Sequence, residues 1–289
     1  MWRHTYLVSR LAPRLLLFGS LWLFLLGIVC ALLWISLYFD AERDKPRLTG
    51  LHSVLRFNPG LGMVPLVDRK TRLLHVNTAS PFSFTRLTDQ LSAFLSRYVQ
   101  HYEGGMRNDC SNDQLFLSER RTCFFDINAG GPCSLQDGFG FYRGEPCVAL
   151  KLNNIFGWLP DPVDKTKKGV LVKCAGRSPI DQELLGPVCY YDLRWYERYV
   201  SNGSIVGGFK DFLRVNDQAC FNSASYGQFD SMFYPYINQA NYHQPLVFVK
   251  FPRVTRYTII RIKCWLEAKN IQVNIAQSEG SLTFTLLVD

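Results

Sequence analysis

Residues 15–39 read LLLFGSLWLFLLGIVCALLWISLYF and contain no charged side chain and no proline. A helix rises about 1.5 Å per residue, so this stretch makes a helix of roughly 37 Å, long enough to cross a hydrocarbon core of about 30 Å with some tilt. A buried helix of a water-soluble protein would keep a polar face, whereas the polar side chains here are only Ser20, Cys30, Ser36 and Tyr38. We therefore expect a transmembrane helix over 15–39.

A cleaved signal peptide is the alternative interpretation of the same stretch. Its apolar region usually spans about 7–15 residues and ends at a site with small residues. This run is longer and ends in Leu37-Tyr38-Phe39-Asp40, which does not resemble such a site. The sequence thus predicts an uncleaved signal anchor after a cytoplasmic tail, residues 1–14.

The cysteines and the glycosylation sequon indicate the orientation of the span. Residues 1–14 before the span and residues 40–47 after it each contain three Lys or Arg residues, so the positive-inside rule decides little. Eight of the nine cysteines follow the span, an even number that suggests disulfides in an oxidising compartment, and no C-x-x-C pair typical of zinc sites is present. The one N-glycosylation sequon, at Asn202, is on the same side. We expect a single-pass type II protein of the plasma membrane, with its N-terminus in the cytoplasm.

The chain beyond the span divides into an expected extracellular stalk, residues 40–80, and an ectodomain, residues 81–289. Prolines at 46, 59 and 65 interrupt any long helix in the stalk. Apolar residues then recur at helical spacing from Leu87 to Tyr102, which predicts a helix with one buried face. Thr88 is the expected cap at its start, and Gly104-Gly105 is its expected end.

The second half of the ectodomain has the alternation of β-strands. Val170, Val172 and Cys174 share one face, and in residues 258–266 every even position from 260 onward is apolar. Residues 246–251 and 282–288 are two more expected strands. With one helix, several strands far apart in sequence and disulfide-linked loops, we predict an immunoglobulin-like antiparallel β-sandwich.

Patterns of catalytic chemistry are missing from the chain. It contains no H-E-x-x-H, G-x-S-x-G or P-loop pattern, and Gly138-Phe139-Gly140 with Gly144 is interpreted as a turn in a Cys-rich loop. The net charge of +8 is spread out, without a Lys/Arg block of the nucleic-acid-binding kind. We expect that the chain is not an enzyme and has no catalytic residue or metal site. We also expect that it binds no cofactor and no nucleic acid.

Several short motifs occur in the order found in the beta subunits of sodium/potassium- and proton/potassium-transporting ATPases. The chain resembles a divergent member of this family. The resemblance runs over nearly the whole chain, from the span to the last strand. The motifs that carry it are Pro59-Gly60-Leu61, Gly131-Pro132-Cys133-Ser134, Gly144-Glu145-Pro146-Cys147, Lys151-Leu152-Asn153, Phe233-Tyr234-Pro235-Tyr236, Gln244-Pro245-Leu246 and Ile260-Arg261-Ile262-Lys263-Cys264.

This resemblance implies a non-catalytic partner of a P-type cation pump. Such a subunit assists folding and membrane delivery of the catalytic alpha subunit and tunes its potassium affinity in sodium/potassium exchange. The implied partners are that alpha subunit and membrane lipid. A second class is a pump-independent cell-surface adhesion or structural protein with the same fold, which the short tail and the single sequon permit.

The disulfides of the family imply three pairings: Cys110–Cys123, Cys133–Cys147 and Cys174–Cys264. Cys189 and Cys220 remain, and both lie where thiols oxidise. We predict that they form a fourth bridge, with two free thiols or an intermolecular pair as the alternatives.

The resemblance also implies contacts with the alpha subunit. With Gly27 matched to the glycine in the family's span, Phe18 and Trp22 occupy the positions of two family tyrosines and share a helix face, since they are four residues apart. Their alternative role is to face lipid. Tyr234 and Tyr236 are the expected contacts outside the membrane, with core packing as their alternative.

Overall fold

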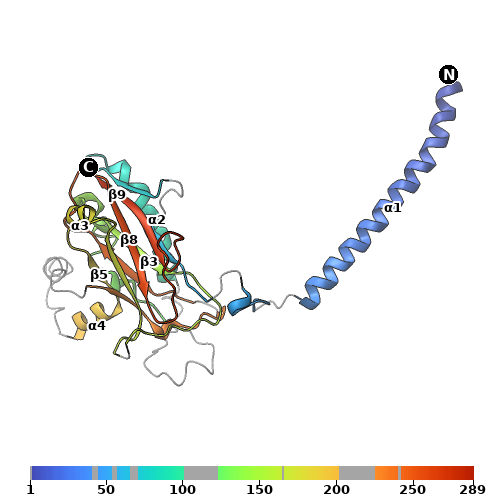
Figure 1. Cartoon of the computed structure of the whole chain (residues 1–289). Helices are drawn as coiled ribbons and strands as arrows, with labels where there is room; N and C mark the ends of the chain where they lie inside the picture. Colours follow the sequence, from blue (N-terminus) through green and yellow to red (C-terminus); the bar gives the residue numbers. More distant parts are fainter. Residues whose placement is uncertain are drawn as a thin grey trace. The chain divides into compact units, whose positions relative to one another are not determined.

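The computed structural model describes residues 2–40, 45–53, 57–65, 71–100, 123–164, 166–201, 225–239 and 242–289. The chain forms two compact units, Met1–Thr49 and Gly50–Asp289 (Figure 1). The first unit contains the span, and the second is the ectodomain. Asn202, Cys110 and Cys220 lie outside the described residues.

The first unit is dominated by one helix, α1 (Trp2–Asp40). Its segment Leu16–Phe39 is long and apolar enough to cross a membrane, and none of that segment is buried within the chain. Ser20 donates its hydroxyl proton to the carbonyl oxygen of Leu17 at 2.9 Å, so the polar group is satisfied inside the helix. Trp34 and Tyr38, four residues apart, stack with ring centroids 5.4 Å apart.

The ectodomain consists of two β-sheets around one hydrophobic core, in agreement with the predicted sandwich. Each pair of neighbouring strands is antiparallel except β2 and β9, which are parallel. The four-stranded sheet has the order β1 (Leu61–Val64), β3 (Cys147–Leu152), β7 (Leu246–Lys250) and β5 (Cys189–Tyr191). The five-stranded sheet has the order β2 (Leu73–Val76), β9 (Ser281–Val288), β8 (Ile260–Glu267), β4 (Gly169–Gly176) and β6 (Gly227–Asp230).

The apolar alternation in β8 places its even positions in the core. Ile260, Ile262, Cys264 and Leu266 are fully buried, while Arg261 between them is exposed. This pattern was expected because successive side chains of a strand point to opposite faces of the sheet. The strands predicted at 246–251 and 282–288 are observed at Leu246–Lys250 and Ser281–Val288, and the apolar face predicted for Val170, Val172 and Cys174 lies in a strand at Gly169–Gly176.

The stretch predicted as a stalk contributes a strand to each sheet, which corrects that expectation. β1 pairs with β3, and β2 pairs with β9. Each is only four residues long, and prolines 59 and 65 flank β1 without interrupting it. Short apolar runs bounded by prolines are therefore compatible with edge strands, where one side needs no ladder hydrogen bonds.

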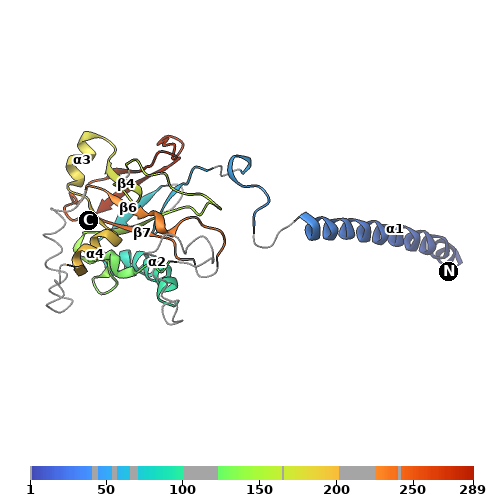
Figure 2. The ribbon, with the colours of Figure 1, turned by 90° about the horizontal axis from the view of Figure 1, so that it is seen from below.

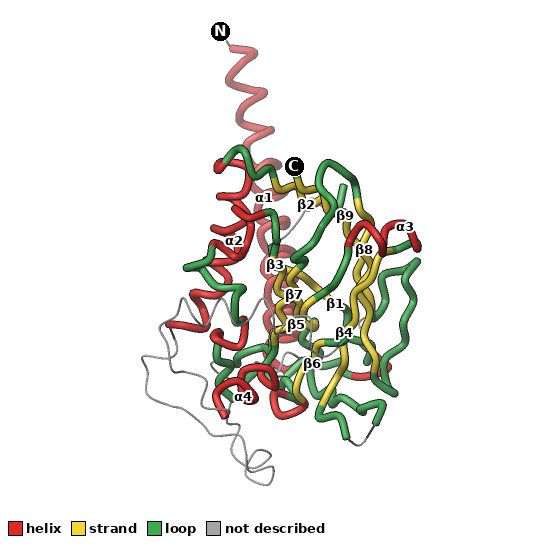
Figure 3. The backbone as a smooth tube through the Cα atoms, turned by 90° about the vertical axis from the view of Figure 1, so that its left-hand side faces the viewer, coloured by secondary structure: helices red, strands yellow, loops and turns green. Residues whose placement is uncertain are grey.

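Helices lie against both sheets. In Figures 2 and 3, α2 (Pro81–Gln100) and α4 (Leu193–Ser201) lie on the side of β3, β7 and β5, whereas α3 (Pro179–Leu185) lies beside β4 and β8. The 3₁₀ turns are η1 (Gly50–His52), η2 (Ile127–Gly130), η3 (Gly138–Arg143) and η4 (Ser231–Phe233).

The predicted amphipathic helix begins earlier than expected. It starts at Pro81, so Thr88 is not its cap; the Thr88 hydroxyl donates to the carbonyl oxygen of Thr85 at 2.8 Å. Leu91 and Leu95 are buried as the spacing predicts. The N–H groups of a first helical turn have no acceptor within the helix, so proline, which lacks an N–H, is favoured there. Pro81 is therefore the sequence signal for this start.

Two disulfides link described residues. Cys133 and Cys147 close a loop with a sequence separation of 14, and Cys174 and Cys264 close one of 90. Cys174 lies directly opposite Cys264 in the ladder between β4 and β8, so this bridge joins neighbouring strands of one sheet. In antibody domains the corresponding bridge joins the two sheets instead.

Candidate partner-binding surface

The loops at one end of the sandwich gather where the chain from the span joins the ectodomain. β1 starts and β3 ends here, because Leu61 pairs with Leu152. Asn58 and Gln272 exchange two side-chain-to-backbone hydrogen bonds of 3.0 Å, which tie the start of the ectodomain to the loop between β8 and β9. We call this the proximal end, and the opposite end, which carries the C-terminus, the distal end.

The segment 231–236, predicted to contact the alpha subunit, lies at the proximal end and turns into the core. Asp230 caps η4 by accepting a hydrogen bond from the backbone N–H of Met232. The ring of Phe233 is buried and lies 5.8 Å from that of Phe125. This anchoring fixes the path of the two tyrosines that follow.

Tyr234 is a core residue, with only 8% of its surface exposed. Its ring meets that of Trp158 edge to face, with centroids 5.4 Å apart. Burial raises the pKa of Tyr234 well above its usual value, since the phenolate would lose its hydration. The alternative of core packing thus describes where the structure places Tyr234. The sequence did not predict its partner Trp158.

Tyr236 is half-buried and is held mainly through its backbone. Gly157 donates its N–H to the carbonyl oxygen of Tyr236 at 2.8 Å, next to an isolated bridge between Phe156 and Tyr236. The Tyr236 ring lies 5.0 Å from that of Tyr242, and its hydroxyl bonds to Asn238 at 3.1 Å. Of the two predicted tyrosines, Tyr236 therefore has the side chain that a partner could reach.

The aromatic side chains Phe18 and Trp22 are exposed on α1. They are four residues apart in a continuous helix and therefore lie on the same side of it. This arrangement fits both lipid contact and contact with a second transmembrane helix.

A partly buried charged cluster, which the sequence did not predict, stiffens the loop closed by Cys133 and Cys147. Lys250, at the end of β7, is fully buried, and its Nζ lies 2.8 Å from a carboxylate oxygen of Glu145. Arg143 bridges Asp137 and Glu145, at 3.5 Å from the latter. Burial raises the pKa of Asp137, and Arg143 opposes that rise. These contacts hold the turn that the glycines of η3 begin.

Gly140 in η3 confirms that the glycine-rich stretch is a tight turn. Its φ is +72°, and a Cβ there would lie 2.2 Å from the carbonyl oxygen of Glu145. Only glycine fits such a close backbone approach. Among the described residues, no group of three His, Cys, Asp or Glu side chains could hold a metal ion.

Cys123 and Cys189 are also disulfide-bonded, while their predicted partners, Cys110 and Cys220, lie outside the described residues. We predict that a thiol-blocked, unreduced digest yields a peptide that links Cys189 to Cys220. A bridge across about 31 residues would stabilise by roughly 3–4 kcal/mol in the chain-entropy model. Mass spectrometry of that digest is the measurement. Blocking reagent on Cys220, or a covalent dimer lost on Cys220→Ser, would contradict the pairing.

Comparison with known proteins places the whole arrangement in one family. The family model described as sodium/potassium ATPase beta chain matches residues 14–200 and 213–284, which include the span and strands of both sheets. The sodium/potassium-transporting ATPase subunit beta-1 of Drosophila melanogaster is 28% identical over 96% of this chain and 85% of its own length. The beta-2 subunit of Rhinella marina is 24% identical over 97% of this chain and 88% of its own.

A third relative, the probable sodium/potassium-transporting ATPase subunit beta-3 of Caenorhabditis briggsae, is 26% identical over 84% of this chain and 70% of its own length. The matched region begins at the N-terminal apolar helix, so the family and the helix together describe a single-pass membrane protein. The chain belongs to the sodium/potassium ATPase beta chain family.

Proposed function

We propose that this chain is the non-catalytic beta subunit of a P-type cation-transporting ATPase. In this role it assists the folding and plasma-membrane delivery of a catalytic alpha subunit and tunes its potassium affinity during sodium/potassium exchange. The observation that carries the proposal is that the family match extends through the span and the ectodomain together. A protein that had kept only the ectodomain fold would not need similarity in both parts.

The orientation follows from the same proposal, with the N-terminus in the cytoplasm and the cysteine-rich ectodomain outside. The two disulfides between described residues support an oxidising compartment for the ectodomain. Asn202, in the only sequon, is then the proposed N-glycosylation site.

A topology experiment tests the orientation. In intact cells, protease is expected to remove a tag placed after Asp289 and to spare a tag placed after Met1. An N-glycosidase is expected to increase the gel mobility of the wild type but not that of Asn202→Gln. Surface labelling of the N-terminal tag would contradict the proposed orientation. A wild type insensitive to the glycosidase would show that Asn202 is unused.

We propose that Tyr236 contacts the extracellular loops of the alpha subunit, whereas Tyr234 supports it from within the core. The half-buried ring of Tyr236 is braced by Tyr242 and by its backbone contact to Gly157. A pre-positioned aromatic side chain of this kind is typical of residues that carry binding energy at interfaces.

The two tyrosines should respond differently to truncation. Tyr236→Ala is expected to reduce recovery of the alpha subunit with this chain by about fivefold or more and to leave the ectodomain folded. Tyr234→Ala is expected to destabilise the ectodomain itself by about 3–5 kcal/mol, because it removes a buried ring. Affinity recovery and tryptophan fluorescence unfolding separate the two effects. A Tyr236→Ala chain that recovers alpha normally would remove Tyr236 from the interface.

Delivery of an alpha subunit tests the function itself. Cells depleted of their own beta subunits are expected to show alpha at the surface, by surface biotinylation, only when this chain is supplied. The half-activating potassium concentration of the ATPase is then expected to differ from that measured with the original beta subunit. Surface arrival of this chain alone, with alpha retained inside, would favour the pump-independent adhesion or structural role.

A further inference from the structure

The proximal end of the ectodomain exposes a group of apolar side chains on three neighbouring loops. Their exposed fractions run from 37% for Ile275 to 54% for Leu159. The loops are tied together, since Asn270 donates its side-chain N–H to the carbonyl oxygen of Leu159 at 2.7 Å and Asn58 bonds to Gln272. The members of this proximal apolar cluster are Phe57, Leu159, Val163, Val273 and Ile275.

The loop that carries Val273 and Ile275 needs little water to satisfy its backbone. Asn274 and Glu279 exchange two backbone hydrogen bonds of 2.9 Å. The side-chain oxygen of Asn274 also accepts from the N–H groups of Ala276 and Gln277, at 3.1 and 3.2 Å. A lipid environment tolerates a backbone only where its polar groups are paired internally. This turn can therefore present two aliphatic side chains to a poorly hydrated surface.

The length of chain between the span and the ectodomain limits how far this end can lie from the bilayer. The span ends at Phe39, and the ectodomain begins at Gly50, against which Phe57 packs. Eleven extended residues reach at most about 40 Å, so the proximal end stays within that distance of the membrane. This tether keeps the ectodomain at a high effective concentration at the membrane surface. A contact that is too weak to recruit a free domain to the membrane can therefore still orient the tethered one.

We propose that the proximal apolar cluster rests on the phospholipid surface of the bilayer that α1 crosses, at the boundary between headgroups and acyl chains. Its polar rim fits this depth, because Asp161 and Lys269 beside it are exposed and reach toward one another at 3.7 Å. The contact would set the orientation of the sandwich relative to the membrane and would not require a partner subunit. It is separate from the Tyr236 contact proposed at the same end, so the cluster should keep its lipid contact when an alpha subunit binds.

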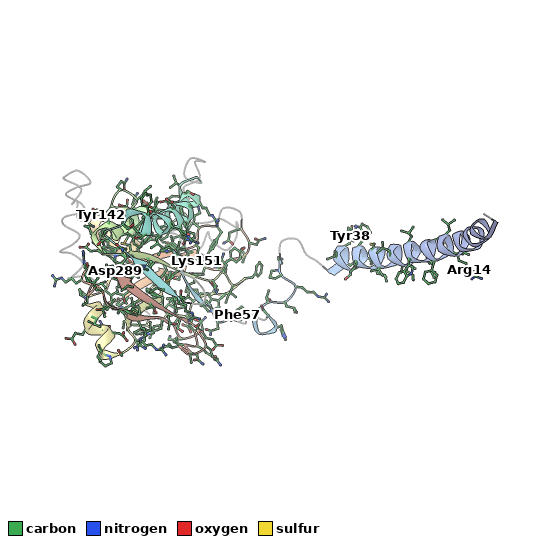
Figure 4. The ribbon with its side chains drawn as sticks, turned by 90° about the horizontal axis from the view of Figure 1, so that it is seen from above. Arg14, Tyr38, Phe57, Tyr142, Lys151 and Asp289 are labelled. Atoms are coloured by element: carbon green, nitrogen blue, oxygen red, sulfur yellow. A yellow bond between two sulfur atoms is a disulfide. The ribbon has the colours of Figure 1, made fainter. Side chains whose placement is uncertain are left out.

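The distal end also exposes large hydrophobic side chains and therefore supplies the control. Ile180, Tyr257 and Ile259 are exposed by 71%, 78% and 60%. Ile259 comes before the start of β8 and Val273 after its end, so the two residues lie at opposite ends of this strand. The eight residues of β8 span about 26 Å. Figure 4 shows Phe57 at one end of the ectodomain and the C-terminal Asp289 at the other. An apolar probe in water would reach both ends, but a probe held in lipid should reach one.

The experiment uses the full chain alone in phosphatidylcholine nanodiscs, with a photoactivatable diazirine near the headgroup end of one acyl chain. Peptide mapping is expected to find the label on the span and on the peptides with Leu159, Val273 and Ile275, at least fivefold above those with Ile180 and Ile259. The double variant Val273→Ser, Ile275→Ser should lower labelling of its own peptide severalfold. Its unfolding should stay cooperative, with the transition at a slightly lower denaturant concentration, because each side chain is about two-fifths exposed.

Three results would overturn the proposal. The first is a labelled span with an unlabelled proximal cluster, and the second is equal labelling of the two ends. The third is loss of the cluster's label on addition of an ATPase alpha chain, which would assign the surface to a protein partner. Failure of alpha to bind this chain would refute the proposed function and leave the lipid labelling intact.

Discussion

Replacement of both Cys174 and Cys264 by alanine is expected to lower the free energy of unfolding of the ectodomain by about 4–5 kcal/mol. The bridge closes a loop with a sequence separation of 90, so in the chain-entropy model its loss restores much freedom to the unfolded chain. Such a loss is a large part of the 5–15 kcal/mol that typically stabilises a folded domain. We therefore expect the variant to accumulate in the endoplasmic reticulum.

The bridge between Cys133 and Cys147 is the control for this prediction. It is also buried and undergoes the same chemical change, but its sequence separation is only 14. The same model gives about 3 kcal/mol for its removal, roughly 1.5 kcal/mol less. Denaturant unfolding of the purified chains in mild detergent measures both. Equal losses, or a larger loss at Cys133 and Cys147, would contradict the dependence on loop length.

The second large effect is expected at Lys250. Lys250→Ala removes a fully buried side chain and its ion pair with Glu145 at 2.8 Å, so we expect a loss of about 2–5 kcal/mol, most of it from the cavity left by the lysine stem. Lys250→Met keeps most of the buried stem and removes only the charge. Its loss should be smaller than that of Lys250→Ala, because the Met side chain fills most of the space of the buried lysine stem and Arg143 still faces Glu145.

Lys173 provides the matched surface control. Its Nζ lies 2.9 Å from Glu267, nearly the same separation as in the buried pair, but both side chains are about one-third exposed. Because solvent screens such a pair, Lys173→Met should change stability by less than about 1 kcal/mol. The same unfolding measurement applies. If Lys250→Ala were as mild as Lys173→Met, the partly buried charged cluster would not support the loop.

The sequence predicts the parts of this protein whose signal is local. A run of 25 uncharged residues predicts the span, and the apolar residues at positions 260, 262, 264 and 266 predict β8. In each case the pattern lies within one continuous stretch of sequence. β1 was missed because four residues between prolines show too little periodicity.

What could not be predicted depends on residues far apart in the chain. Lys250 and Glu145 are brought together only when β7 and the loop before β3 are in place. Tyr234 and Tyr236 look equivalent in sequence, yet the ring of Trp158 takes Tyr234 into the core and leaves Tyr236 at the surface. The difference between a packed and a presented tyrosine arises from tertiary contacts, which motif similarity does not report.

The measurement that tests the central claim most directly is recovery of an ATPase alpha chain with this protein. The tagged full chain is purified in mild detergent from cells that express a sodium/potassium ATPase alpha subunit, and bound protein is quantified by mass spectrometry. We predict an alpha chain in about equal molar amount. Phe18→Ala with Trp22→Ala should reduce that amount, and Phe24→Ala, on the opposite side of α1, should not. A correctly folded, surface-delivered chain that recovers no alpha subunit would contradict the account.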